Sequence, residues 1–117
     1  MAGCVFRVSG ASFDADRFLA ESSFRPIAAR PDGFNVEVSP SETPFSEQVR
    51  LAVQFLRNHA SDLARLRAAP IDGAELDFGL WMNDSPAQSA TFPVDLLKLA
   101  VAANVALKVS FYAASDV

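Results

Sequence analysis

The hydrophobic period of this chain changes twice within residues 73–113, which read GAELDFGLWMNDSPAQSATFPVDLLKLAVAANVALKVSFYA. Apolar residues recur at every second position over 74–83 and again over 105–112, which is the period of a half-buried strand. Between them, residues 94–103 are apolar at helical spacing. Because a half-buried strand has one side in the core and the other side free, this pattern predicts a sheet that helices cover on one face only.

Elements of the same two kinds account for most of the other residues. We expect further strands over residues 3–9, 24–30, 34–39 and 87–92. We expect the other helices over residues 13–22 and 44–68, and the longer one has an apolar stripe at three- and four-residue steps. The 117 residues, 1–117, are therefore predicted to form a single α+β domain. Its architecture would be a two-layer sandwich, with three helices on one face of a mixed, mainly antiparallel sheet of four to six strands.

Turn and cap residues support these boundaries. Ser12 or Asp14 can cap the first helix by accepting from the free amides of its first turn. Thr43 is expected to cap the long helix, with a proline at its first position. Asn104 is a natural left-handed terminator for the last helix. Residues 31–33 read Pro-Asp-Gly, in which proline presets the turn and glycine supplies a positive φ, so they predict a hairpin.

Charge and hydropathy restrict the partners. The formal net charge is −4, whereas binding to nucleic acid usually needs a basic face that displaces counterions. The same charge argues against an anionic membrane surface. The longest apolar stretch, residues 96–114, contains Lys98 and Lys108 and alternates in its second half, so we expect no membrane span. No nucleic-acid partner and no membrane partner are predicted, and a cytoplasmic location is expected.

The sequence lacks the residues that several common kinds of bond or site require. The chain has one cysteine, Cys4, so an intrachain disulfide is excluded, and we expect this side chain to face inward from the first strand. The five glycines occur singly and form no phosphate-binding loop. One histidine and one cysteine cannot supply the four ligands of a structural zinc site. We therefore expect no metal site and no cofactor.

Two features could still support catalysis. His59 is the one plausible proton-transfer group near neutral pH, although its place beside the apolar stripe favours a partly buried, hydrogen-bonded packing residue. Glu75 and Asp77 point the same way along one strand, about 7 Å apart. That spacing could serve a paired-carboxylate mechanism. The alternative interpretation is a solvated face on which the two acids pair with Arg7 or Lys108 of neighbouring strands. A small enzyme using Glu75 and Asp77, or His59, is thus one candidate function, and no catalytic residue is assigned.

The helix-free sheet face suggests a different function. Sorting inward from outward positions assigns to this face Arg7, Asn35, Glu37, Glu75, Asp77, Trp81, Lys108, Ser110 and Tyr112. The chain's one tryptophan and one tyrosine are both in this set, and these residue types are enriched at interfaces. The alternative is that residues 83–86 or the chain end fold over Trp81. We predict a non-enzymatic binding or assembly module that meets a protein partner or a second copy through Trp81, Tyr112, Arg7, Asp77, Glu75 and Lys108.

Four segments also carry a resemblance to a known family. They read FRVSG at 6–10, FDAD at 13–16, FPVDLL at 92–97 and LKVSFY at 107–112. In layout and in these segments the chain resembles an uncharacterised bacterial family of small α+β proteins, a domain of unknown function. The resemblance is a pattern of apolar positions across most of the chain and implies no known activity. Some relatives look like immunity proteins of bacterial toxin systems, which are small acidic domains that block a toxin, so an immunity-type inhibitor is a further candidate.

Overall fold

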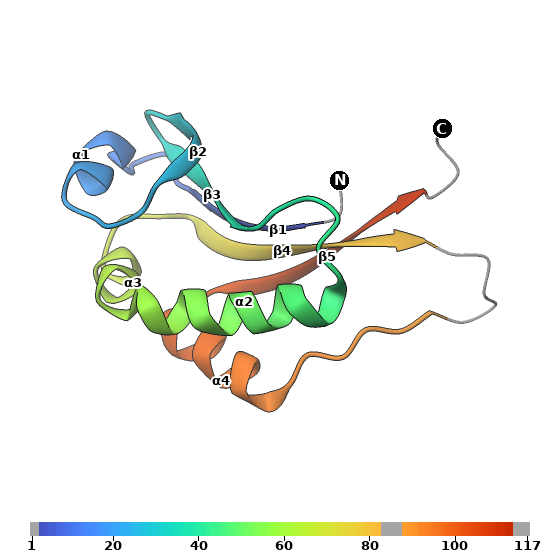
Figure 1. Cartoon of the computed structure of the whole chain (residues 1–117). Coiled ribbons are helices and arrows are strands. Elements are labelled where there is room, and N and C mark those ends of the chain that lie inside the picture. Colours follow the sequence, from blue (N-terminus) through green and yellow to red (C-terminus); the bar gives the residue numbers. More distant parts are fainter. Residues whose placement is uncertain (1–2, 83–87, 114–117) are drawn as a thin grey trace.

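The computed structural model of the chain describes residues 3–82 and 88–113. In chain order its elements are β1 (Cys4–Ser9), α1 (Ala15–Ala20), β2 (Pro26–Arg30), β3 (Gly33–Ser39), α2 (Phe45–Asn58), α3 (Ala60–Arg67), β4 (Gly73–Met82), α4 (Val94–Ala103) and β5 (Ala106–Ala113). The fold is an α+β sandwich of a sheet and a helical layer. Figure 1 shows α2, α3 and α4 together below the sheet, and α1 at the end where the β2–β3 hairpin lies.

The sheet has five strands in the order β2-β3-β1-β4-β5. Its neighbouring strands are antiparallel except for β4 and β5, which are parallel. A parallel pair needs a long crossover connection, and α4 lies within it. The prediction of a mixed, mainly antiparallel sheet is therefore confirmed. The parallel pairing brings the last residues of β4 and β5 to the same end of the sheet, with Trp81 opposite Tyr112.

The core lies between the sheet and the helices. Apolar side chains at alternate strand positions enter it, and Phe6 and Leu76 are fully buried there. Each helix adds buried residues to the same core: Phe18 from α1, Phe55 from α2, Leu66 from α3 and Leu96 from α4. All four helices therefore cover one face of the sheet, as the alternating pattern predicts.

Most of the large aromatic volume lies at the hairpin end of this core. We call the following group the phenylalanine cluster: Phe6, Phe13, Phe18, Phe24, Phe34 and Phe55. The Phe6 ring centroid lies 5.2 Å from that of Phe55 and 5.8 Å from that of Phe24. Full burial of one such side chain contributes about 1.5–3 kcal/mol. The cluster thus holds α1 and the hairpin against α2.

The helical layer contains four helices, not the three predicted. The expected long helix is broken at His59, whose φ of −110° and ψ of 23° leave the helical region. The His59 ring packs against Phe24 and Phe55 and bonds to Ser23 on the loop before β2, so tertiary contacts hold the break. Leu66 beyond the break still reaches the common core. The first helix is also shorter than predicted, since it spans Ala15–Ala20.

Two further predictions are wrong. Residues 88–92 form no strand, and Phe92 instead packs its ring 5.0 Å from that of Phe78. Gly33 has no positive φ. Its role is a close approach, because a Cβ at this position would lie 2.5 Å from the Val8 carbonyl oxygen of β1. The predicted hairpin is nevertheless present, with Arg30 opposite Gly33. The predicted turn at residues 83–86 lies outside the described residues.

The capping predictions are confirmed in two of three cases. Asp14 caps α1 by accepting from the Arg17 amide at 3.1 Å. Asn104 ends α4 in the left-handed region, with φ 58° and ψ 43°. Thr43 does not cap α2, because the N-cap position belongs to Pro44 and the Thr43 hydroxyl donates to the Pro40 carbonyl at 2.6 Å. Proline has no side-chain acceptor, so the helix begins without a side-chain cap.

Candidate functional site

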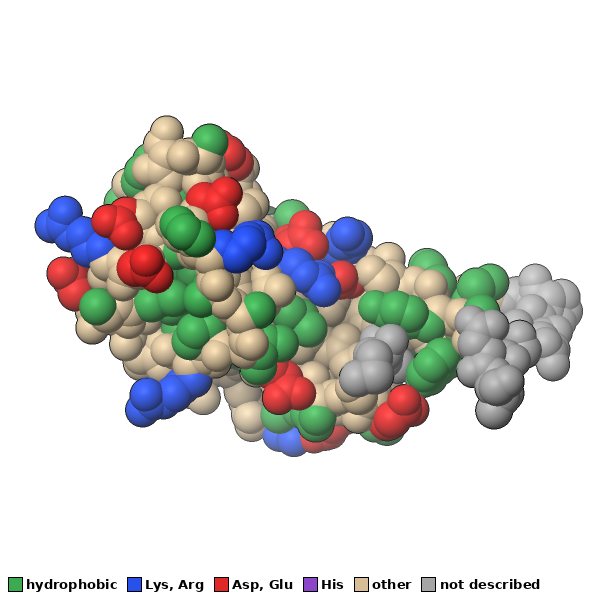
Figure 2. All heavy atoms as spheres, turned by 90° about the horizontal axis from the view of Figure 1, so that it is seen from above, with side chains coloured by type: hydrophobic (Ala, Val, Ile, Leu, Met, Phe, Trp, Pro, Cys, Tyr) green, Lys and Arg blue, Asp and Glu red, His purple; other side chains and the backbone are tan. Residues whose placement is uncertain are grey.

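The sheet face turned away from the helices is the candidate site, and we call it the uncovered face. The structure brings to it every residue predicted for binding: Arg7, Glu75, Asp77, Trp81, Lys108 and Tyr112. They share this face because side chains on neighbouring strands alternate in step across the registered pairs. Figure 2 looks onto it and shows charged side chains across the middle, with hydrophobic side chains toward the end where β4 and β5 finish.

A network of opposite charges occupies the middle of the uncovered face. The Arg7 guanidinium donates to the Asp77 carboxylate and lies 3.7 Å from the Glu75 carboxylate. On the other side of Glu75, the Lys108 ammonium is 3.9 Å away. The Ser110 hydroxyl donates to Asp77 at 2.7 Å. The acids are thus paired as the alternative interpretation of the sequence predicts, with Arg7 from β1 and Lys108 from β5.

Asp77 is the most constrained member of this network. Its side chain is only 7% exposed, whereas the side chains of Arg7 and Glu75 are 39% and 33% exposed. An ion that has lost most of its water needs its partners, because removing one leaves an uncompensated charge. Asp77 therefore works as a structural anchor of the charged centre, and Arg7 and Glu75 present its solvent-facing part.

Cys4 lies on the opposite side of β1, fully buried in the core. Burial, together with the negative charge of Asp77, raises the pKa of its thiol to about 12, and Arg7 offsets part of this rise. The thiolate is the nucleophilic form of cysteine, so this side chain is held in the unreactive form near neutral pH. The sequence prediction that Cys4 faces inward is confirmed.

The end of the uncovered face is aromatic. Trp81 is 39% exposed, and its ring centroid lies 6.0 Å from that of Tyr112 on the neighbouring strand. The indole N–H donates to the Glu42 carboxylate at 3.2 Å, and the Gln88 side chain donates to the Trp81 carbonyl. The residues that could have covered the indole, 83–86 and the chain end, lie outside the described residues. Within the described part, the indole keeps a substantial solvent-facing surface.

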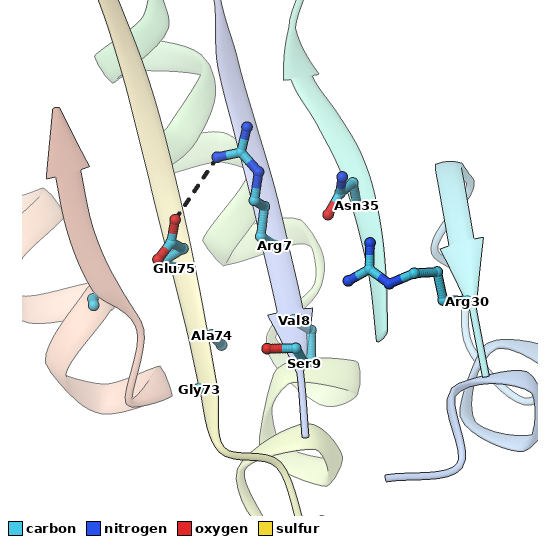
Figure 3. Close-up of a pocket in the computed structure, with 9 residues that line it drawn as sticks. Arg7, Val8, Ser9, Arg30, Asn35, Gly73, Ala74 and Glu75 are labelled. Atoms are coloured by element: carbon cyan, nitrogen blue, oxygen red, sulfur yellow. Dashed lines mark ion pairs between the residues drawn. The ribbon is translucent and has the colours of Figure 1, made fainter. Parts of the chain in front are cut away.

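Two hollows open on this face, one on each side of Arg7. The first, which we call the arginine hollow, measures about 330 Å³ and is lined by Arg7, Arg30, Asn35 and Glu75, among others. Figure 3 shows the Arg30 side chain extending from β2 toward Asn35 and β1, while Arg7 turns to Glu75. The second, the tyrosine hollow, measures about 240 Å³ and is lined by Val5, Ile27, Glu37, Asp77 and Tyr112, among others. It lies beside the aromatic end of the face.

Three lining or neighbouring residues were not predicted. Ile27 and Arg30 belong to β2, a strand that the sequence analysis predicted without assigning its side chains to either face. A register shift between Pro26 and Ala28 disturbs the alternation there, so periodicity cannot assign the side on which Ile27 lies. Glu42 lies in the segment between β3 and α2 at a φ of 70°, and no sequence signal connects it to Trp81.

His59 lies elsewhere, among the helices and the phenylalanine cluster. Its Nδ1 is 3.0 Å from the Ser23 hydroxyl, which itself donates to Asp62 at 2.6 Å. Because the one hydroxyl hydrogen points to the carboxylate, Nδ1 donates to the Ser23 oxygen. In a nucleophilic triad the imidazole would instead accept the serine hydrogen. Ring contacts at 4.8 Å to Phe24 and 4.7 Å to Phe55 make His59 the packed, hydrogen-bonded residue that was predicted.

Asp62 joins this group to the rest of α3. Burial acts to raise the pKa of its carboxyl, but hydrogen bonds from the Ser23 hydroxyl and amide, with the charges of Arg65 and His59, lower the pKa below its usual value. Arg65 also donates to the Glu21 carbonyl at 3.0 Å. The group therefore ties the segment after α1 to α3.

Comparisons with known proteins give no relative: the chain matches no protein-family model, no curated protein and no solved structure. The resemblance in the four segments described above stays a prediction. Residues 3–82 and 88–113 contain no group of three or more His, Cys, Asp or Glu side chains placed to hold a metal ion. None of the helices described has the length and apolar character needed to cross a bilayer.

Proposed function

We propose that this protein is a non-enzymatic binding module and that its uncovered face contacts a protein partner. The observation that carries the proposal is the half-exposed Trp81 beside Tyr112, on a sheet face that no described helix covers. A tryptophan that keeps a large surface in water gains by burial against another molecule, and tryptophan and tyrosine are common anchors of interfaces.

The shape of the face supports a protein partner. The tyrosine hollow, about 240 Å³, adjoins the aromatic end and includes the apolar surfaces of Val5 and Ile27. A side chain of a partner can enter this hollow while its neighbours pack on Trp81 and Tyr112. Aromatic anchors bordered by polar groups are common in protein–protein interfaces.

The charges around the face define the partner further. Arg7, Glu75, Asp77 and Lys108 largely neutralise one another at the centre. The acids Glu37 and Glu42, by contrast, are exposed near the aromatic end, and the whole chain carries a net charge of −4. Opposite potentials favour encounter and orientation of two proteins. The proposed partner therefore presents an apolar side chain within a basic rim.

The enzymatic alternative has less support. A paired-carboxylate mechanism needs both acids to reach one substrate, but Glu75 lines the arginine hollow and Asp77 lines the tyrosine hollow. Both carboxylates are also engaged by Arg7. The His59 imidazole packs among phenylalanine rings and belongs to neither hollow.

An immunity-type inhibitor is the second candidate. It is a special case of the same binding role, since such a domain blocks a toxin by direct contact. The exposed acids next to the aromatic end favour it, because they would complement a basic toxin surface. A bacterial source and a cytoplasmic location belong to this proposal.

Three baits would test the binding role: the wild type, Trp81→Ala and a matched control, Gln54→Ala, on the exposed side of α2. Each is immobilised and incubated with bacterial lysate, and each retained protein is then purified and titrated. Calorimetric titration compares all three baits, because Trp81 is the only tryptophan of the chain and its fluorescence is absent from Trp81→Ala. We expect Trp81→Ala to weaken binding of the purified partner at least tenfold, and Gln54→Ala to leave it unchanged.

Equal binding of one purified partner to all three baits would overturn the proposal for this face. Self-association through the same face is tested by light scattering on the wild type and Trp81→Ala. A monomer mass for both proteins would exclude a homodimer built on Trp81.

A further inference from the structure

A second apolar surface lies along the β5 side of the molecule. Among the described residues, the exposed large hydrophobic side chains other than Ile27 belong to the end of β4, to α4 or to β5: Trp81, Met82, Val94, Leu97, Val101 and Phe111. Val101 is 77% exposed and Phe111 is 56% exposed. These side chains gather on neighbouring elements, and a larger exposed apolar surface marks an interaction site more often than scattered single residues do.

The apolar residues of α4 form a stripe on one side of the helix. Val94, Leu97 and Val101 recur at three- and four-residue steps, so they share a side. The buried residues Leu96 and Ala100 lie on another side, toward the core. A third side of the helix faces α3 and carries Leu99, Ala102 and Ala103. The stripe is therefore turned away from both the core and α3.

The two edge strands of the sheet differ in how well they are protected against pairing with another strand. The β2 edge is blunted by Pro26, which has no amide hydrogen, and by a register shift between Pro26 and Ala28. The β5 edge has neither device over its eight residues, and Lys108 is its one charge. No other described strand pairs with the outer side of β5. Such an edge presents free backbone donors and acceptors to another strand.

We propose that a second copy of this chain occupies the β5 edge, with its own β5 running antiparallel to the first. The two five-stranded sheets then continue into one, and the α4 stripe of each copy lies on the helix side of the joined sheet. Its backbone hydrogen bonds use the outer edge of β5, and Lys108 and Tyr112 border both this edge and the uncovered face. The dimer does not require that face to bind a foreign protein.

The residues of β5 are self-complementary in this arrangement. With the two-fold axis at Ser110, antiparallel pairing sets Val109 opposite Phe111 of the second copy, on the helix side of the sheet. On the other side it sets Lys108 opposite Tyr112 of the second copy. Apolar pairs and a cation beside an aromatic ring both stabilise cross-strand neighbours. The axis also keeps the two lysines four residues apart, so like charges do not meet.

The size of the edge suits a stable dimer. Eight strand residues extend about 26 Å, which is longer than most strands in globular proteins. Exposed side chains of α4 and Phe111 add an apolar layer below the strand pair. A two-fold contact buries the same set twice, as specific homodimer interfaces do.

Light scattering after size-exclusion chromatography, at about 1 to 100 μM protein, measures the oligomeric state directly. We expect the wild type to show twice the 12.6 kDa mass of one chain. Phe111→Lys should give the monomer, because it places a charge opposite the apolar Val109 of the second copy. The matched control is Ile27→Lys, which changes a similarly exposed apolar residue on the other edge strand and should leave the dimer intact. Val101→Glu, on the helix surface, is a second disrupting variant whose folding does not depend on β5.

The register is tested by cross-linking. Under mild oxidation, Ser110→Cys should form a disulfide-linked dimer, whereas Lys108→Cys should not, since the register separates its two copies. Cys4 is fully buried and does not compete. Circular dichroism confirms the fold of each variant. A monomeric wild type across the concentration range would overturn the proposal. So would a dimer that persists in both Phe111→Lys and Val101→Glu, or one that Trp81→Ala alone dissociates.

Discussion

The two ends of the sheet are both rich in large apolar side chains, but only one end is closed. At the hairpin end, the phenylalanine cluster packs six rings between strands and helices, and Phe6 is fully buried. At the other end, β4 and β5 run on beyond the helices, as Figure 1 shows, and Trp81, Met82 and Phe111 stay exposed. The alternating period continues through both ends, so it reports which way a side chain points and not whether anything covers it.

Several elements are needed to close the hairpin end. Helix α1, the segment after it and the Ser23–Asp62 contact together bring Phe18 and Phe24 over the sheet. No comparable element covers the far end within the described residues. Apolar surface that a chain leaves open after folding is available for binding, and both proposals above place their contacts at or beside that open end.

The largest expected difference between the two ends is in stability. Phe6→Ala removes a fully buried ring, and we expect it to lower the free energy of unfolding by about 3–5 kcal/mol. Phe111→Ala makes the same chemical change at a position that is 56% exposed, and should cost less than about 1 kcal/mol in the monomer. Urea unfolding of both variants measures the difference. Similar losses would show that the open end is packed after all.

A smaller effect is expected at the charged centre between the two ends. Asp77→Ala leaves the Arg7 guanidinium and the Ser110 hydroxyl without their shared acceptor, and should cost about 1.5–3 kcal/mol. Glu75→Ala removes a partly exposed partner of the same arginine and should cost about 0.2–1 kcal/mol. The same urea experiment ranks the pair. If the two losses are equal, Asp77 is not the anchor of the network.

The smallest expected effect is a pH dependence at the closed end. The pKa of Asp62 is lowered in the folded state, so its contribution is present above the unfolded pKa of about 3.9 and is lost as pH falls toward the folded value. We expect Asp62→Asn to be less stable than the wild type by roughly 1 kcal/mol at pH 7. This difference in the free energy of unfolding should become smaller between pH 5 and pH 3, as measured by urea unfolding at each pH. Ser23→Ala, which removes the hydroxyl donor, should reduce this pH dependence. If the unfolding free energies of the wild type and Asp62→Asn change in parallel with pH, the prediction is wrong.

Local signals predicted much of the fold. Alternation in β1, β4 and β5 assigned residues to the covered and uncovered faces, and Asp14 and Asn104 marked helix ends by their own conformational chemistry. Elsewhere local signals were insufficient. Gly33 resembled a turn glycine, but the close approach of the Val8 carbonyl explains it. The helix break at His59 depends on Phe24 and Ser23, which are distant in sequence.

In the candidate site, too, local sequence patterns predicted some residues and missed others. The facing of Arg7, Asp77 and Trp81 followed from the two-residue period of each strand. Ile27, Arg30 and Glu42 were missed, because their positions depend on a register shift or on a connecting segment that meets β4. Strand order brought these residues to their neighbours, and no periodicity encodes it.

The order of apolar and polar residues was enough to establish the two layers, the one-sided helical cover and the side-chain directions in β1, β4 and β5, because these properties depend on backbone geometry that repeats every two or four residues. Which strands are neighbours, where the helical cover stops, and which side chains meet across the sheet depend on contacts between distant segments. Those contacts closed the phenylalanine cluster, paired Arg7 with Asp77, and left the ends of β4 and β5 open.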